Sequence, residues 1–103
     1  MQKLSSSEEK VMLIIWQTKG PITYIEVQAG VEKRFGDKWK GQTVCTFINR
    51  LKNKGYISTF KEGRFTHYEV LISIEDYRKM QLEEMIERLY QGNSAKMIEE
   101  LSE

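Results

Sequence analysis

Cysteine and histidine are almost absent from this sequence. Cys45 and His67 are the only residues of their kinds among 103. A single cysteine excludes an intramolecular disulfide framework, and one cysteine with one histidine excludes a four-ligand Cys/His zinc site. The same scarcity excludes most nucleophile–base pairs of enzymes. We therefore expect a protein that is not an enzyme, with no catalytic residues, no metal and no cofactor.

Long hydrophobic stretches are also missing. The first five residues contain no apolar segment of a signal peptide, and no run approaches the roughly 18 apolar residues of a membrane span. We therefore expect a cytoplasmic protein without a membrane partner. Hydrophobic residues make up 40% of the chain and charged residues 30%, which is typical of a soluble globular protein. This length suits one compact domain, or a small domain with an appendage.

The net charge is only +1, but the charges are segregated along the chain. Residues 1–70 carry 12 basic and 7 acidic side chains, whereas residues 71–103 carry 4 basic and 8 acidic ones. Between Lys33 and Arg64, nine basic residues accompany only two acids. This basic segment indicates a surface for a polyanion, although an unevenly charged solvated surface explains the counts equally well.

Capping residues and apolar periodicity predict a mainly α-helical chain with one β-hairpin. At three predicted helix starts, a Ser or Thr stands three positions before an acid, which is the spacing of a capping box. The predicted helices begin at Ser5 or Ser6, at Thr23, after Lys40, at Ser73, and at Asn93 or Ser94. They end near Lys19-Gly20-Pro21, Gly36-Asp37, Lys54-Gly55, Gln91-Gly92 and Leu101. The predicted strands are Tyr56–Phe60 and Phe65–Leu71, joined by a turn at residues 61–64.

The third predicted helix has the cleanest periodicity in the chain. Its apolar residues recur at i, i+3, i+4 and i+7 and form one stripe for the core, namely Val44, Phe47, Ile48 and Leu51. The opposite face and its flanks carry only amides, hydroxyls and one cation: Gln42, Thr43, Thr46, Asn49, Arg50 and Asn53. An ordinary solvent-facing surface usually includes Glu or Asp, so the absence of acids here indicates a specialised surface.

The order of the elements, three helices followed by a hairpin, is that of a winged helix-turn-helix. In this fold the third helix enters the major groove of DNA and the hairpin flanks it. Gln and Asn bond adenine edges, Arg bonds guanine or phosphate, and the Thr methyl contacts thymine. Basic residues before the helix (Lys38, Lys40) and on the hairpin (Lys61, Arg64) are expected to reach phosphates. We expect residues 1–71 to be the DNA-binding domain.

Residues 72–103 are expected to form a helical dimerisation segment. Its apolar side chains form a stripe on the long helix and a second patch on the short one, and unpartnered surfaces of this kind usually mark an interface. An alternative is that the long helix folds back on its own domain. The residues expected at the dimer interface are Tyr77, Met80, Leu82, Met85, Ile86, Leu89, Tyr90, Met97, Ile98 and Leu101.

The chain also resembles the penicillinase-repressor (BlaI/MecI/CopY) family of bacterial transcriptional regulators. The resemblance runs from Leu4 to about Leu101, and no single piece of it is a strong motif. The matching pieces are Leu4-Ser5 with Glu9 and Val11-Met12, Ile15-Trp16, Lys19 to Thr23, Trp39, Gln42 to Leu51, Lys54-Gly55, Glu62-Gly63-Arg64, and Glu87 to Gly92. The ordered set over the full length is specific.

This resemblance implies a homodimer that forms through the C-terminal helices and occupies a dyad-symmetric, palindromic operator as a repressor. It implies base contacts from Gln42, Thr43 and Thr46, with Asn49 and Arg50 close to the DNA backbone. An unidentified sensor or inducer would end repression. The competing hypothesis is a winged-helix protein-interaction module that has lost DNA binding, because a fold does not determine a function.

Four departures from the family pattern limit what the resemblance implies. Glu100-Leu101 aligns with the family's Asn-Phe cleavage site, and no Cys follows Cys45 to form the copper-binding Cys-x-Cys pair. The usual tail beyond the last helix is missing, so we expect a smaller dimer surface. Lys40-Gly41 replaces the Ser-Pro that opens the third helix, which removes a cap.

Four further residues have plain structural interpretations. We expect Cys45 to be a half-buried thiol on the side of the third helix, in preference to a redox sensor. We expect His67 to be an ordinary strand residue, since no second metal ligand lies near it in the sequence. Trp16 and Trp39 are expected to anchor the core and a loop.

Overall fold

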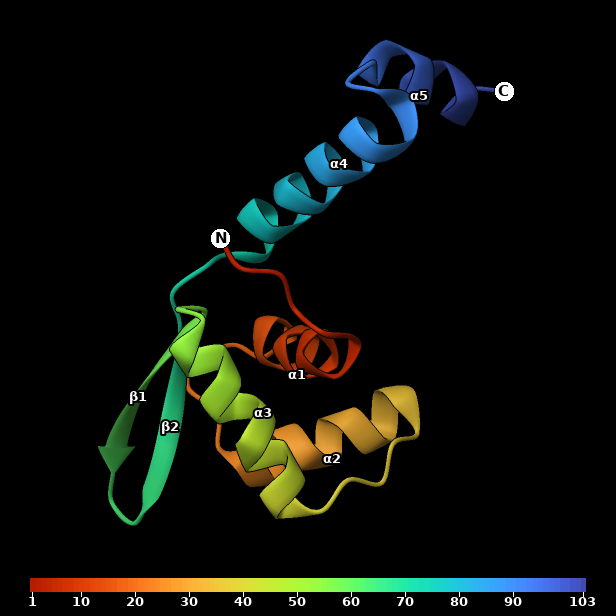
Figure 1. The fold of residues 1–103 in the computed structure, drawn as a ribbon. Coiled ribbons are helices and arrows are strands. Elements are labelled where there is room, and N and C mark those ends of the chain that lie inside the picture. Colours follow the sequence, from red (N-terminus) through yellow and green to blue (C-terminus); the bar gives the residue numbers. More distant parts are fainter. The chain divides into compact units, whose positions relative to one another are not determined.

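A computed structural model describes all residues, 1–103, and its elements follow the predicted order (Figure 1). They are α1 (Ser6–Gln17), α2 (Tyr24–Phe35), α3 (Gly41–Asn53), β1 (Ile57–Glu62), β2 (Phe65–Val70), α4 (Ile74–Tyr90) and α5 (Ser94–Leu101). The chain divides into two compact units, Met1–Ile72 and Ser73–Glu103. No helix is both long enough and apolar enough to cross a membrane.

The capping residues begin the helices where the sequence predicts. At α1, the Ser5 hydroxyl accepts from the Glu8 amide at 3.1 Å, and the Ser5 amide donates to Oε1 of Glu8 at 2.7 Å. At α2, the amide and hydroxyl of Thr23 both donate to Oε1 of Glu26, at 3.2 and 3.0 Å. At α4, the Ser73 hydroxyl accepts from the Asp76 amide at 3.1 Å. The bonds donated by backbone amides satisfy groups that the first turn of a helix leaves without a partner.

The core of the first unit lies between α1, α2 and α3, which pack against one another in pairs (Figure 1). The predicted apolar stripe of α3 supplies three fully buried residues, and the fourth, Phe47, is half-buried with its ring 5.0 Å from that of Trp39. Trp16 is half-buried and donates from Nε1 to the carbonyl of Ile72 at 2.9 Å. Both tryptophans are therefore anchors, as predicted.

The hairpin differs from the prediction at its turn. Ile57 pairs with Val70 and Glu62 with Phe65, so Lys61 and Glu62 belong to β1 and only Gly63 and Arg64 make the turn. Gly63 has a φ of +68°, a conformation in which only glycine is unstrained and which permits a two-residue hairpin turn. The four-residue turn expected from the sequence is therefore wrong.

One pairing has no counterpart in the prediction. Ile22, between α1 and α2, forms an isolated antiparallel bridge with Tyr68, whose amide donates to the Ile22 carbonyl at 3.1 Å. Both side chains are buried, at 2% and 6% exposure. The bridge ties β2 to the segment before α2, so the wing is attached to the helical core and does not extend freely.

Gly30 allows α1 and α2 to approach closely, which gives a testable prediction. A Cβ at Gly30 would lie 2.6 Å from Cγ2 of Ile14, which is itself 1% exposed. Although alanine has the better helix propensity by about 1 kcal/mol, we expect Gly30→Ala to destabilise the protein by about 1–3 kcal/mol in urea unfolding. In an Ile14→Ala background the same change should be neutral or stabilising. Equal destabilisation in both backgrounds would contradict this packing.

Candidate nucleic-acid interface

The outer face of α3 is exposed, as predicted. Gln42, Thr46, Asn49 and Arg50 are all exposed, and Thr43 is half-buried. The hydroxyl of Thr46 donates to the carbonyl of Gln42 at 3.0 Å, within the helix. Its proton is therefore already engaged. The groups left to meet a base are the methyl, which suits contact with thymine, and the lone pairs of the hydroxyl oxygen, which can accept. Amide, hydroxyl and guanidinium side chains thus share one solvent-facing surface that carries no acid.

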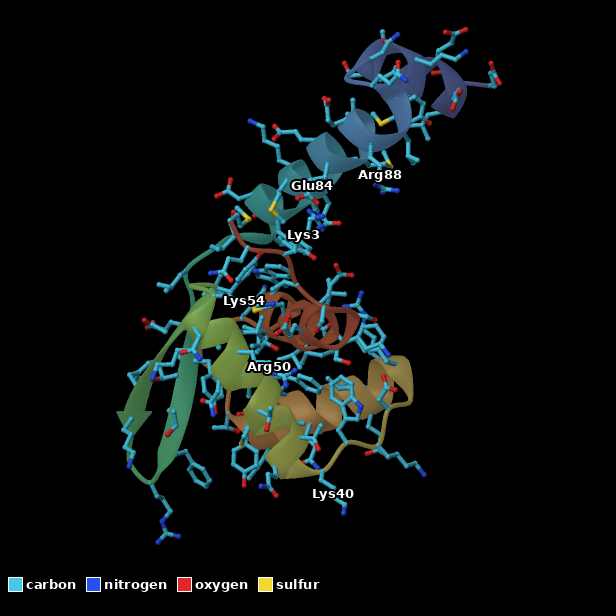
Figure 2. All side chains as sticks on the ribbon, viewed as in Figure 1. Lys3, Lys40, Arg50, Lys54, Glu84 and Arg88 are labelled. Carbon is cyan, nitrogen blue, oxygen red and sulfur yellow. The ribbon has the colours of Figure 1, made fainter.

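The N-terminal end of α3 is uncapped and basic. Lys40 occupies the N-cap position and its side chain makes no capping bond, as expected from the missing Ser-Pro, and no acid lies in the first turn. Gly41 fits there because a Cβ would lie 3.1 Å from the ring of Tyr24. Lys38 and Lys40 are both exposed, and Figure 2 shows Lys40 at the start of the helix. An uncapped helix N-terminus with neighbouring lysines favours a phosphate group.

The hairpin places its basic and acidic side chains on opposite faces. Lys61 pairs with Thr66 and shares a face with Ile57 and Tyr68, which are buried toward the core. Glu62 pairs with Phe65 on the other face, and Arg64 lies at the exposed turn. Glu69, the second acid of the wing, pairs with Ser58 on the same face as Glu62, so both acids lie on the face opposite Lys61.

Arg50, one turn before the end of α3, lies close to an aromatic ring of the same helix. Its guanidinium carbon lies 5.7 Å from the centre of the Phe47 ring on the same helix. A cation this close to an aromatic ring gains a cation–π interaction that restricts the side chain without removing it from solvent. Arg50 is thus exposed but partly oriented (Figure 2).

Two charged residues of the basic segment, one acid and one cation, form ion pairs with residues of α1. Asp37, one of its two acids, is paired with Lys10 of α1 at 2.7 Å. Lys54, one of its cations, is paired with Glu8 of α1 at 2.6 Å. Among the exposed cations of the segment are Lys33, Lys38, Lys40, Arg50, Lys52, Lys61 and Arg64. The positive surface therefore survives these pairings and is centred on α3, the segment before it and the wing.

The Glu8–Lys54 pair is the part of this region that the sequence analysis missed. Glu8 is 2% exposed although it carries a carboxylate. Burial raises the pKa of this group, but the Lys54 ammonium and the Ser5 amide and hydroxyl outweigh burial and hold the pKa below its ordinary value. A signal was present, because Glu8 precedes Val11 by three positions and Met12 by four and so lies on the buried face of its helix.

Cys45 and His67, the only cysteine and the only histidine, do not form a metal site or a catalytic pair. Cys45 is half-buried, as predicted. His67 is half-buried in β2, and its ring stacks on Phe60 at 5.5 Å with an interplanar angle of 25°. Nδ1 of His67 is buried and has no hydrogen-bond partner. No cluster of three or more His, Cys, Asp or Glu side chains is placed to hold a metal ion.

The second unit presents apolar side chains to solvent. Of the ten residues predicted at a dimer interface, four are exposed: Leu82, Leu89, Ile98 and Leu101, at 48%, 60%, 58% and 77%. Tyr77 is buried and the other five are half-buried. The hydroxyl of Tyr90 donates to Oε2 of Glu100 at 2.8 Å, a bond between α4 and α5 that raises the pKa of Tyr90. Within this unit, a side-chain hydrogen bond thus joins the two helices, and several large apolar side chains are exposed to solvent.

Comparisons with known proteins agree with this geometry. The sequence model of the family described as penicillinase repressor matches residues 4–103. The penicillinase repressor of Bacillus licheniformis is 30% identical over 96 residues, which are 93% of this chain and 73% of that protein. The methicillin resistance regulatory protein MecI of Staphylococcus aureus strain N315 is 30% identical over 91 residues, which are 87% of this chain and 71% of that protein.

A solved structure extends the agreement from sequence to fold. The solution structure of Bacillus licheniformis BlaI, in its monomeric form in complex with the blaP half-operator, is 33% identical to this chain with a TM-score of 0.59. The match covers 74% of this chain and 89% of that one. Three helices, the hairpin and their order are therefore those of a winged helix-turn-helix, followed by two C-terminal helices. This chain belongs to the penicillinase repressor family.

Proposed function

We propose that this protein is a homodimeric, sequence-specific DNA-binding repressor that occupies a dyad-symmetric operator through two winged helices. The observation that carries the proposal is the exposed, acid-free face of α3, flanked by cations before the helix and on the wing. A BlaI structure with a related winged helix contains the blaP half-operator, which supports the same use of this surface. Occupation of a promoter would exclude the transcription machinery.

Each exposed side chain of the interface has a distinct part in this proposal. Gln42, Thr43 and Thr46 contact base edges in the major groove, with Gln42 suited to adenine and the Thr46 methyl to thymine. Contacts to the sugar–phosphate backbone come from Lys38, Lys40, Asn49, Arg50, Lys61 and Arg64. The base contacts select the sequence, and the backbone contacts set the register and supply most of the affinity.

The dimer forms through α4 and α5 in this proposal. The exposed Leu89 and Leu101 are large apolar side chains that water solvates poorly, and a second copy of the same helices would cover them. The excess of acids in residues 71–103 keeps this unit away from phosphates. Two recognition helices in successive major grooves would then contact half-sites whose centres are about 34–36 Å apart.

Selection of bound sequences from a library of random 30-base-pair duplexes tests the whole proposal. We expect recovery of a palindromic sequence and, by analytical ultracentrifugation, two protein chains per duplex. A single unrepeated half-site bound by one chain would contradict the dimer. No shift of any duplex at micromolar protein and low salt would exclude DNA binding and favour the protein-interaction module.

Substitutions at Gln42 and Lys61 separate base contacts from phosphate contacts. We expect Gln42→Ala to relax the preference at one position of each half-site, with a loss of about 1–3 kcal/mol on the preferred base pair. Lys61→Ala should weaken binding to all duplexes alike, because a phosphate contact carries no sequence information. Titration of both variants against single-base operator variants measures the difference. Indistinguishable profiles would show that these roles are wrongly assigned.

A further inference from the structure

Lys54 stands in the basic segment and at the C-terminal end of α3, where a phosphate contact would be the simplest assignment. The structure gives its ammonium a different set of partners. Nζ of Lys54 lies 2.6 Å from Oε1 of Glu8 and donates to the carbonyl of Lys3 at 2.8 Å (Figure 2). Only 25% of the Lys54 side chain is exposed, against 2% for Glu8. The cation is therefore directed into the protein.

The same contact joins two segments that lie 46 positions apart in the sequence. Oε1 of Glu8 accepts from the Ser5 amide as well as from Lys54, so the capping box of α1 and the end of α3 share one carboxylate oxygen. Tyr56, just before β1 and fully buried, donates its hydroxyl to the carbonyl of Gln2. Residues 2–5 are thus tied both to the last turn of α3 and to the start of the wing.

The last turn of α3 carries a predicted DNA contact. The Lys54 amide donates to the carbonyl of Arg50 at 2.9 Å, and the Tyr56 amide donates to the carbonyl of Leu51 at 3.0 Å. Movement of Lys54 would therefore move the turn that contains Arg50 and the segment that leads into β1. Backbone hydrogen bonds thus connect Lys54 to the last turn of α3, and the segment before β1 to the same helix.

We propose that Lys54 is a positioning residue that binds no phosphate and, through Glu8 and residues 2–5, sets the end of α3 and the base of the wing for DNA. The proposal rests on the proposed function. Removal of the acidic side chain of Glu8 then weakens binding to a polyanion. A simple electrostatic account gives the opposite sign, because loss of a negative charge strengthens attraction to phosphates.

The test is the salt dependence of binding to the highest-affinity duplex recovered from the random library. Full-length Glu8→Gln, Lys54→Met and the double variant are compared with the wild type, and affinities are expressed per folded chain from circular dichroism. We expect both single variants to bind about three- to tenfold more weakly at every salt concentration, with an unchanged slope of log K against log salt. Lys61→Gln is the matched control, and its slope should become less steep by about 0.9 for each phosphate that Lys61 neutralises in the wild type.

The double variant provides the same measurement of salt dependence if a single variant does not fold. Glu8→Gln with Lys54→Met leaves no buried charge and retains the Glu/Gln position of the capping box, so we expect it to fold. Because it also lacks the contact between Lys54 and Glu8, we expect it to bind about three- to tenfold more weakly than the wild type, with an unchanged slope. A slope less steep by about 0.9 in any Lys54 variant, which corresponds to one phosphate, or a stronger affinity for Glu8→Gln, would overturn the inference. If the wild type bound no duplex, the proposed function itself would fail, and the inference would fall with it.

Discussion

DNA affinity is expected to fall by about 10³–10⁵-fold between 50 and 200 mM salt. The physical reason is counterion release, because each phosphate that a cation neutralises frees a condensed counterion, and added salt opposes that release. The proposed backbone contacts include five cations in each chain, Lys38, Lys40, Arg50, Lys61 and Arg64, all of which are exposed. A dimer therefore offers ten, and the limiting slope of log K against log salt is about −9.

Fluorescence anisotropy with a labelled duplex at four or five salt concentrations measures this slope. Lys79→Gln is a suitable control, because Lys79 is exposed on α4 and lies outside the proposed contacts, so its slope should match the wild type. Arg64→Gln should give a less steep slope than the wild type. A wild-type slope shallower than about −3 would mean that most of the exposed cations do not contact phosphates.

Local signals in the sequence predicted the helices of this protein well. Ser5 with Glu8 and Thr23 with Glu26 mark helix starts through hydrogen bonds that span only three residues, so no tertiary information is needed to locate them. The stripe of α3 repeats over four apolar positions in a 13-residue helix, which is enough to separate a buried face from an exposed one. Exposure of Gln42, Thr46, Asn49 and Arg50 follows from the same periodicity.

Features that depend on distant residues escaped the sequence analysis. The bridge between Ile22 and Tyr68 is a single residue pair, and Ile22 lies outside any alternating pattern that would mark a strand. The turn was predicted too long because Lys61 and Glu62 have low strand propensity, and cross-strand pairing with Thr66 and Phe65 overrides it. Both errors concern the wing, whose structure depends on pairing and not on local preference.

The largest error in the charge analysis was to count Lys54 with the surface cations. A count along the sequence adds charges without knowing which acid from elsewhere neutralises which cation. Glu8 lies 46 positions away and meets Lys54 only because α1 packs against the end of α3. The basic surface was nevertheless predicted, because the exposed cations of α3 and the wing outnumber those that are paired.

Loss of Lys54 is expected to cost more stability than loss of its partner Glu8. Lys54→Met leaves the Glu8 carboxylate, at 2% exposure, without its cation, and an uncompensated buried charge costs about 3–5 kcal/mol. Glu8→Gln should cost less, about 1–3 kcal/mol, because the remaining Lys54 side chain is 25% exposed and can reach water. Urea unfolding of the full chain at pH 7 measures both values. Equal losses would contradict the difference in burial.

The same pair predicts a loss of stability in acid. The pKa of Glu8 is lowered in the folded protein from an ordinary value of 4.5, so the folded state binds fewer protons than the unfolded state in this range. The stabilisation is therefore fully present above pH 4.5 and disappears as the pH falls through the folded pKa. Below pH 4.5 the wild type should lose stability faster than Glu8→Gln, by at most about 1.4 kcal/mol per pH unit for one group. Parallel pH profiles for the two proteins would show that Glu8 does not titrate with unfolding, and Lys54 would then lose its assigned counter-ion.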